Sequence, residues 1–285
     1  MKTDFKISPY LYLLPAFIML WIFFFLPFFQ TIVMSFYDYS VDFYSPSFTM
    51  FSNYSKILNS DVFLKSILNT FWFLILCVPA LVILPLIVAI LIDQKIKFKT
   101  GYKLIIYTPV VVSIVVVAIA FKWLYQPEGL LNYFFHKEIG YLTDPKIAMV
   151  SVAIVTIFKG IGYYMMIYLA ALMSVPKELI EAAEIDGAGF IRKHLTVTIP
   201  HIMPVIALVS TISSISALKV FVEIYVMTKG GPLNSTKTIV YYIYEKAFEN
   251  LDLGSASAAC VILLILVMAF SAVNILCFER DKYKL

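Results

Sequence analysis

The chain has 285 residues, of which 61% are hydrophobic and 14% are charged, and its formal net charge is +4. A soluble domain carries about a quarter charged residues, so this composition excludes an ordinary soluble domain. The apolar residues form continuous runs of roughly 20 residues, the length of a membrane-spanning helix. A membrane β-barrel would instead show short segments of alternating hydrophobicity. The sequence therefore predicts an all-α polytopic membrane protein.

Six transmembrane helices are predicted from these apolar runs. They cover residues 11–34, 66–92, 104–124, 148–173, 201–227 and 256–278. The first run follows a short, weakly basic N-terminus and lacks a small-residue cleavage site. We therefore expect it to be retained as a span rather than removed as a signal peptide.

Lysine and arginine are distributed unequally between two sets of connecting segments. Both termini together with residues 93–103 and 174–200 hold twelve cations, whereas residues 35–65, 125–147 and 228–255 hold seven. Because positive charge favours the cytoplasmic side, both termini and the segment 174–200 are expected in the cytoplasm. The three outer loops are rich in aromatic residues, which suits either anchoring at the interface or contact with an external partner.

No group of residues in the sequence predicts catalysis or metal binding. Cys77, Cys260 and Cys277 lie singly in apolar runs, where cysteine usually serves as a small hydrophobic residue. The phosphate-binding pattern GxxxxGK[ST] is absent, and the three histidines form no ligand cluster. We expect a non-catalytic chain that binds no metal, cofactor or nucleic acid.

The segment 174–200 is a polar island between two long apolar runs. Pro176 suits a helix start, where its missing amide hydrogen costs nothing, and Gly187 permits the left-handed turn that ends a helix. A second short helix is expected over residues 190–198. Such a pair of helices with exposed carboxylates suits docking of a partner protein, and a plain solvated loop is the alternative.

Three motifs in this segment carry a family resemblance. They are Glu181-Ala182-Ala183, Asp186-Gly187-Ala188 and Ile199-Pro200. In this order and spacing they resemble the EAA loop of permease subunits of binding-protein-dependent ABC importers. His194 departs from the pattern, since sugar permeases usually place an aromatic residue there, commonly phenylalanine.

A second signature follows the fifth predicted span. Phe221, Tyr225 and Thr228, then Gly230-Gly231-Pro232 and Ser235-Thr236, resemble the "F..IY..T.GGP..ST" pattern of carbohydrate permeases. This pattern is typical of the subunit that resembles the maltose-type F permease, although the extra N-terminal spans of that permease are absent. The resemblance extends over residues 10–280 of the chain.

The resemblance implies a type I ABC importer permease fold in one domain over residues 1–285, with a core at 66–278 and a coupling loop at 174–200. The implied protein is a multi-pass component of the bacterial cytoplasmic membrane that imports a di- or oligosaccharide by alternating access. Its implied partners are a second homologous permease, two nucleotide-binding ATPase subunits that use ATP and Mg, and an extracytoplasmic sugar-binding protein. The residues implied to couple the chain to the ATPase are Glu181, Ala182, Ala183, Asp186, Gly187, Ala188 and Pro200.

The resemblance also implies a solute pathway through the spans. The matching positions are Gly160, Tyr163, Ser213, Ser216, Ala217 and Val220. Ala217 and Val220 stand where the maltose-type permease has polar amides, so contacts with the solute are expected to differ from those with maltose.

Four charged residues fall within the predicted spans, where charges are costly and usually functional. Lys122 is close to a span end and is expected to reach the interface, whereas Lys159 either does the same or lines a cavity. Lys219 and Glu223 are four residues apart, so on one continuous helix they would share a face. They are expected to form a local ion pair or to line the pathway.

Other functions remain open from the sequence. An ion-coupled secondary transporter would use Lys219 and Glu223, or Lys159, and would need no ATPase partner. An ABC permease for glycerol phosphate would want cationic contacts, which Lys159 or Lys219 offers. The Gly-Gly-Pro loop argues against an amino-acid or peptide permease, and the missing catalytic residues argue against an integral membrane enzyme.

Overall fold

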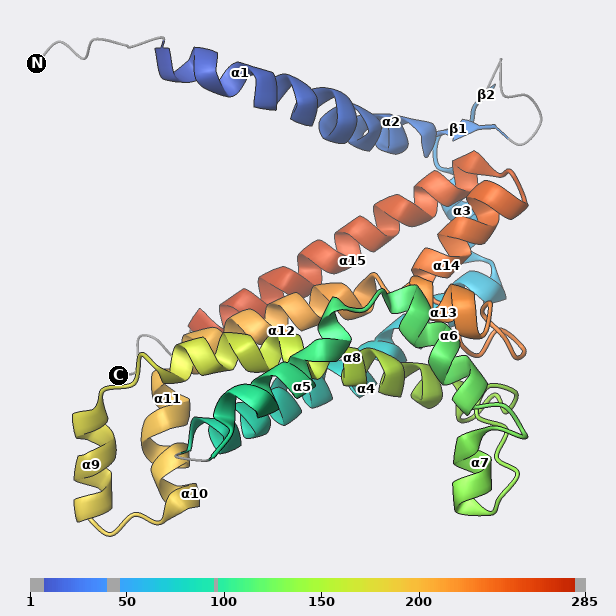
Figure 1. Cartoon of the computed structure of the whole chain (residues 1–285). Coiled ribbons are helices and arrows are strands. Elements are labelled where there is room, and N and C mark those ends of the chain that lie inside the picture. The colour runs from blue at the N-terminus through green and yellow to red at the C-terminus, as the bar shows by residue number, and fades with distance from the viewer. Residues whose placement is uncertain (1–7, 40–46, 95–96, 280–285) are drawn as a thin grey trace, which may run out of the picture. The chain divides into compact units, whose positions relative to one another are not determined.

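The computed structural model describes residues 8–39, 47–94 and 97–279 (Figure 1). The chain forms two compact units. Unit 1 comprises Met1–Phe63 with Tyr242–Leu264, and unit 2 comprises Leu64–Tyr241 with Ile265–Leu285. Helices α4 (Asp61–Asp93) and α15 (Leu253–Glu279) run from one unit into the other. The prediction of a single domain over residues 1–285 stays a prediction.

The predicted polytopic helical fold is confirmed. Over the described ranges, five helical segments are long and apolar enough to cross a membrane, and one bent pair of helices brings the number up to six. The five segments are Tyr12–Met34, Asp61–Asp93, Ala148–Leu172, Met203–Met227 and Leu253–Asn274. The bent pair is α5 (Lys99–Val111) with α6 (Ile114–Leu124), and it stands where the third span was predicted.

Unit 1 contains the first span and the polar elements that follow it. Its elements are α1 (Ser8–Leu20), the π-helical turn η1 (Trp21–Phe25), α2 (Leu26–Met34), β1 (Tyr37–Asp38), β2 (Ser47–Phe48), α3 (Ser52–Leu58), the end of α14 (Ile239–Tyr244), the π-helical turn η3 (Glu245–Glu249) and the start of α15. The two strands are antiparallel, with Tyr37 opposite Phe48 and Asp38 opposite Ser47.

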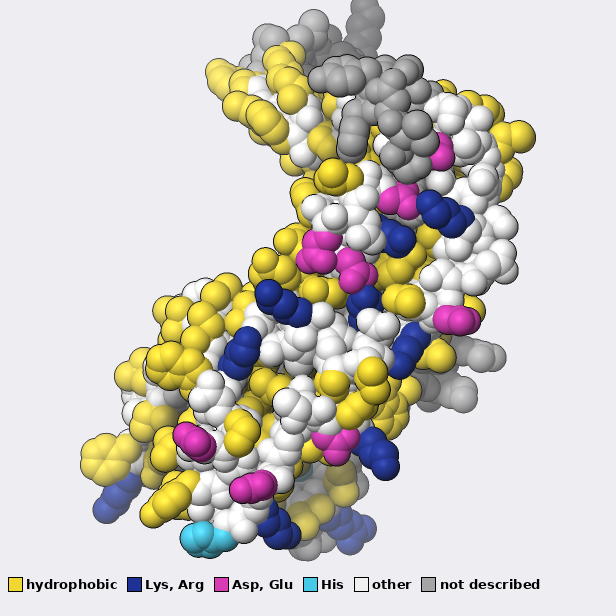
Figure 2. Space-filling model, turned by 90° about the vertical axis from the view of Figure 1, so that its right-hand side faces the viewer, with side chains coloured by type: hydrophobic (Ala, Val, Ile, Leu, Met, Phe, Trp, Pro, Cys, Tyr) yellow, Lys and Arg dark blue, Asp and Glu magenta, His cyan; other side chains and the backbone are white. Residues whose placement is uncertain are grey.

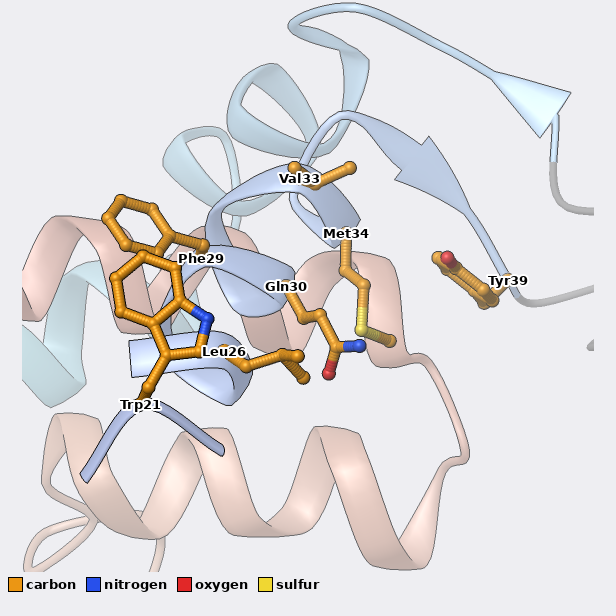
Figure 3. Close-up of a pocket in the computed structure, with 7 residues that line it drawn as sticks. All are labelled: Trp21, Leu26, Phe29, Gln30, Val33, Met34 and Tyr39. Carbon is orange, nitrogen blue, oxygen red and sulfur yellow. The ribbon is translucent and has the colours of Figure 1, made fainter. Parts of the chain in front are cut away.

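The first span exposes its apolar side chains. None of the residues from Tyr12 to Met34 is buried within the chain. A pocket of about 520 Å³ lies along α2, and Figure 3 shows Trp21 beside Phe29 at one side and the amide of Gln30 near Met34. The lining of this pocket is apolar apart from Gln30 and Tyr39, so it suits a hydrocarbon chain or another helix better than a sugar.

Hydrogen bonds fix the start of the last span in unit 1. The Oδ1 atom of Asp252 accepts the backbone N–H of Ser255 at 3.1 Å, which caps the first turn of α15. The Oδ2 atom of Asp252 accepts from Lys56 Nζ at 2.8 Å. The side-chain amide of Asn53 donates to the carbonyls of Ser35 and Tyr37, which ties α3 to the end of the first span.

Unit 2 contains the remaining spans around one apolar core. Its helices are the rest of α4, then α5, α6, α7 (Leu130–Phe135), α8 (Ala148–Leu172), α9 (Lys177–Ile185), α10 (Phe190–Lys193), η2 (His194–Thr198), α11 (Ile199–His201), α12 (Met203–Leu218), α13 (Val222–Met227), the start of α14 and the rest of α15. Helix α8 packs against α5, α12 and α13 (Figure 1). Phe73, Cys77, Val152, Met165 and Tyr168 are among the fully buried side chains of the core.

The third span, predicted over 104–124, is broken into two helices. Helices α5 and α6 meet at an angle of 95°. Pro109 cannot donate a backbone hydrogen bond inside α5. Val112 and Ser113 then adopt extended backbone angles between the two helices. The break leaves the last carbonyls of α5 without partners in their own helix.

The fifth span is interrupted as well. The sequence predicts a span over 201–227, and the structure confirms an apolar segment over Met203–Met227 but divides it into α12 and α13. Helix α12 ends at Leu218, and Phe221 has φ −143° and ψ −56°, outside the helical range. Residues 219–221 therefore form a joint within the span.

We expect Gly254→Ala to destabilise unit 1. A Cβ atom at this position would collide with the carbonyl oxygen of Tyr37 and would lie 2.9 Å from Asn53 Nδ2. Crowding of this kind costs about 1–3 kcal/mol. The measurement is the melting temperature of the purified protein in detergent. Gly101→Ala is the matched control, because a Cβ there meets nothing within 4 Å, and it should leave the melting temperature unchanged or raise it.

Candidate functional site

The segment that was predicted to couple the chain to a partner forms a helical hairpin in unit 2. Helices α9 and α10 lie side by side, and η2 and α11 lead from them back to the span α12 (Figure 1). The prediction of two helices separated by a turn at Gly187 is confirmed. Pro176 precedes the first helical residue, Lys177, and has extended angles of φ −59° and ψ 131°.

The turn after α9 is closed by its own backbone. Gly187 has φ +77°, in the left-handed region that favours glycine. The amide of Gly187 donates to the Glu184 carbonyl at 3.0 Å, and the amide of Ala188 donates to the Ala183 carbonyl at 2.9 Å. These two bonds form a Schellman motif, which satisfies the last carbonyls of the helix. The direction of the chain after α9 is therefore fixed by Gly187.

An ion pair joins the two helices of the hairpin. Lys193 Nζ, at the end of α10, lies 2.6 Å from Glu184 Oε1 in α9. Glu184 is partly exposed, so the pair contributes little free energy by itself. It bridges α9 and α10 in this structure.

The hairpin presents apolar side chains to its surroundings. Ile185 is 86% exposed and Ile191 is 72% exposed. Glu181, Ala182, Asp186 and Gly187 are also exposed, whereas Ala183 and Ala188 are partly buried. Exposed isoleucines beside carboxylates on a rigid hairpin are typical of a protein-binding surface. The sequence analysis missed Ile185 and Ile191, although an apolar residue in a polar segment was a signal that could have indicated them.

His194 lies at the base of the hairpin. Its ring stands edge-on to Phe190 with centroids 4.6 Å apart, and its Nδ1 lies 3.0 Å from Thr198 Oγ1. The Nε2 atom is buried without a hydrogen-bond partner. Burial lowers the pKa of His194, the charge of Lys193 lowers it further, and Asp93 opposes part of the effect. The ring of His194 thus packs against Phe190 as an aromatic side chain would.

The predicted pathway positions differ in accessibility. Tyr163 is 44% exposed, Ser216 is exposed, and Gly160 is partly buried against Leu81 of α4. Ser213, Ala217 and Val220 are buried. Tyr163 and Ser216 are therefore the exposed members of this set, and Ser213, Ala217 and Val220 are the buried ones. The roles of all six stay predictions.

The predicted pairing of Lys219 with Glu223 on one helix face is wrong. Lys219 lies beyond the end of α12 and Glu223 lies in the first turn of α13, so the joint at 219–221 separates them. No ion pair connects these two described residues. Instead, Glu223 Oε1 accepts from Thr156 Oγ1 of α8 at 3.1 Å, and Lys219 is exposed.

The loop that carries Gly230-Gly231-Pro232 is held by α4. Helix α4 has 33 residues, about 50 Å of helix, so its first turns extend beyond the roughly 30 Å of bilayer hydrocarbon. From these turns Lys65 donates to the Leu233 carbonyl at 2.8 Å, and the Asn69 amide donates to the Asn234 carbonyl at 2.8 Å. Leu233, at the tip of this loop, is 79% exposed with φ +51°.

Charged side chains of both signs share the surface. On the face drawn in Figure 2, Lys and Arg side chains are interspersed with Asp and Glu among apolar side chains. A mixed distribution of this kind favours short-range contacts over long-range steering by a field of one sign.

Comparison with known proteins identifies the family. Residues 47–278 match the sequence profile of the family described as "Binding-protein-dependent transport system inner membrane component". The chain belongs to this family. It is therefore the inner-membrane, multi-pass permease component of a binding-protein-dependent ABC importer, and its role in the system is transport.

Individual relatives cover nearly the whole chain. It is 31% identical to the arabinooligosaccharides transport system permease protein AraP of Halalkalibacterium halodurans, over 93% of this chain and 86% of that protein. It is 32% identical to the sn-glycerol-3-phosphate transport system permease protein UgpA of Agrobacterium fabrum, over 94% of this chain and 93% of that protein.

A solved structure confirms the fold. It is the bacterial alginate ABC transporter in complex with an alginate pentasaccharide-bound periplasmic protein, which matches with a TM-score of 0.82. The identity is 24%, over 94% of this chain and 92% of the matched one. The predicted permease fold is thereby established, while the cytoplasmic placement of both termini stays a prediction.

We expect the hairpin to loosen in acid because of His194. A histidine whose folded-state pKa is lowered stabilises the fold above its unfolded pKa of about 6.5, and this stability is lost as the pH falls below that value. The measurement is hydrogen exchange of the amides at 190–200, compared between the parent and His194→Phe at about pH 5.5 and pH 7.5. At the acidic pH the amides of the parent should be less protected than those of the variant, and at about pH 7.5 the two should be equally protected. Equal protection of parent and variant at the acidic pH as well would contradict the prediction.

Proposed function

We propose that this chain and a second homologous permease form the alternating-access pathway of an ATP-driven importer. The solute is a di- or oligosaccharide that an extracytoplasmic binding protein delivers. The observation that carries the proposal is the hairpin of α9 and α10, which is closed by its own backbone and yet exposes Ile185 and Ile191. A rigid element with an exposed apolar surface can transmit force from a partner to the spans.

The partner at this hairpin is one of two nucleotide-binding subunits. The sequence contains no phosphate-binding loop, so the partner, and not this chain, binds ATP with Mg and hydrolyses the ATP. Ile185 and Ile191 enter a groove of that subunit, and Glu181 and Asp186 pair with basic residues at the rim of the groove. Movement of the ATPase then displaces α9 and α10 together, and the displacement passes through α11 to α12.

The proposal of a sugar as solute is supported by chemistry and by the relatives. Tyr163 and Ser216 are accessible in the spans, and aromatic faces and neutral hydroxyls are the groups that bind sugars. The relative from Halalkalibacterium halodurans is named for arabinooligosaccharides, and the solved transporter is named for alginate, which is a saccharide but an acidic one.

Glycerol phosphate is the second candidate solute, since the relative from Agrobacterium fabrum is named for it. A phosphate would need a cation in the pathway. Lys159 Nζ already donates to the Val110 carbonyl at 3.0 Å, which disfavours it as a phosphate ligand. Lys219 is exposed three residues from Ser216 and is the remaining candidate.

We expect Gly187→Ala to uncouple ATP hydrolysis from transport while the protein stays in the membrane. An alanine in the left-handed region costs roughly 1–2 kcal/mol, which opens the Schellman turn and changes the direction of the chain after α9. The measurement is uptake per ATP hydrolysed by the complex in proteoliposomes. Gly189→Ala is the matched control, because Gly189 has φ −66° and a Cβ there meets nothing within 4 Å. Equal coupling in the two variants would contradict the proposal that α9 and α10 transmit movement from the ATPase to the spans.

The solute class is tested with the purified complex and its binding protein. We expect oligosaccharides to stimulate ATP hydrolysis and glycerol phosphate to have no effect, because a neutral solute needs no cation. Stimulation by glycerol phosphate alone, lost in Lys219→Met, would establish the second candidate. Uphill uptake by the permease chain reconstituted alone would contradict both.

A further inference from the structure

The broken third span raises a question about its backbone. A helix that ends inside a span leaves its last four carbonyls without partners in their own helix. In hydrocarbon no water replaces them, and each unsatisfied group is costly. Helix α5 ends at Val111, so Val110 carries one of these carbonyls.

Lys159 provides the missing donor. Its Nζ atom donates to the Val110 carbonyl at 3.0 Å. Lys159 lies in the middle of α8, and its side chain is partly buried. An ammonium group at the C-terminal end of a helix also interacts favourably with the helix dipole. The charge in this span thus has a backbone partner on the neighbouring helix.

The packing of α8 directs Lys159 toward this carbonyl. Gly162, three residues later, lies so close to α5 that a Cβ atom on it would collide with the Ile106 carbonyl. The same atom would lie 2.9 Å from a side-chain carbon of Val110. Because residues three apart lie on one side of a helix, Lys159 and Gly162 both belong to the face of α8 that contacts α5.

The second interrupted span is held in a similar way. Thr156, three residues before Lys159, donates to Glu223 at the start of α13. Lys122 of α6 donates to the Val226 carbonyl near the end of α13 at 3.1 Å. Polar side chains of α6 and α8 therefore contact both ends of α13, and Lys159 of α8 contacts the end of α5.

We propose that Lys159 is a positioning residue of the transport cycle. It holds the end of α5 on α8 in the conformation in which the importer does not hydrolyse ATP, and it releases the Val110 carbonyl when the spans rearrange. This inference rests on the proposed function. Lys159 acts through the backbone of α5 and does not touch the solute.

The experiment measures ATP hydrolysis by the complete reconstituted complex without binding protein or solute, so that no solute needs to be known. Lys159→Met removes the donor, and ATP hydrolysis should rise about fivefold or more, the low end of usual coupling between sites. Lys159→Arg keeps a cationic donor and should stay close to the parent. Lys103→Met is the matched control, because it removes a lysine from the other end of α5.

Three results would overturn the inference. The first is ATP hydrolysis in Lys159→Met that equals that of Lys103→Met or falls below it. The second is unchanged hydrolysis in Lys159→Met without solute, together with loss of the stimulation that binding protein and sugar give in the parent, which would make Lys159 a solute contact. The third is a Lys159→Arg variant that behaves like Lys159→Met, which would show that the donor does not matter.

Two further measurements keep these outcomes interpretable. If Lys159→Met does not assemble with the ATPase subunits, Lys159→Gln takes its place, because its neutral amide is tolerated at this depth but is too short to reach the Val110 carbonyl. Stimulation of the parent complex by binding protein and sugar is measured in parallel. A parent complex without such stimulation would contradict the proposed function. Normal stimulation of the parent, together with ATP hydrolysis in Lys159→Met that equals the parent's in the absence of solute, would contradict this inference alone.

Discussion

The satisfaction of backbone polar groups in a medium without water is the constraint on which this structure depends. A continuous helix such as α8 satisfies this constraint, because its backbone N–H and C=O groups bond to one another within the helix. The third and fifth spans do not, because α5 ends at Val111 and α12 ends at Leu218. At the first of these interruptions Lys159 donates to a carbonyl that its own helix leaves free. Lys159 is thereby part of the scaffold, which explains why a charge occurs at a depth where it is costly.

Helix α8 makes this arrangement possible because it packs closely on its neighbours. Gly162 allows the backbone of α5 to approach, and Thr156 and Lys159 lie within reach of groups on α13 and α5. Between helices in a bilayer the hydrophobic effect gives little attraction, so small residues and hydrogen bonds determine which helices associate. A helix that contacts both interrupted spans is well placed to link their movements.

The hairpin of α9 and α10 follows a different rule, because it lies outside the candidate spans. Its geometry is determined locally by the left-handed Gly187 and by backbone bonds within one turn. Its outer surface keeps Ile185 and Ile191 exposed, an unfavourable arrangement for a free loop and a favourable one for a docked loop. Local closure holds the turn in one geometry, and the exposed apolar groups offer a surface to a partner. The proposed transfer of force to α12 requires both properties.

Local patterns in the sequence determined the number and approximate limits of the spans, the turn at Gly187 and the family, since apolar runs and glycine positions act over a few residues. The tertiary structure alone decided the 95° break between α5 and α6, the joint at 219–221 and the partners of the charged residues. Lys219 and Glu223 have the spacing of a helical pair, and yet Glu223 contacts Thr156, which lies 67 residues away in the chain. This contact arises because α8 packs against α13, and the spacing of residues within one segment does not predict which segments pack together.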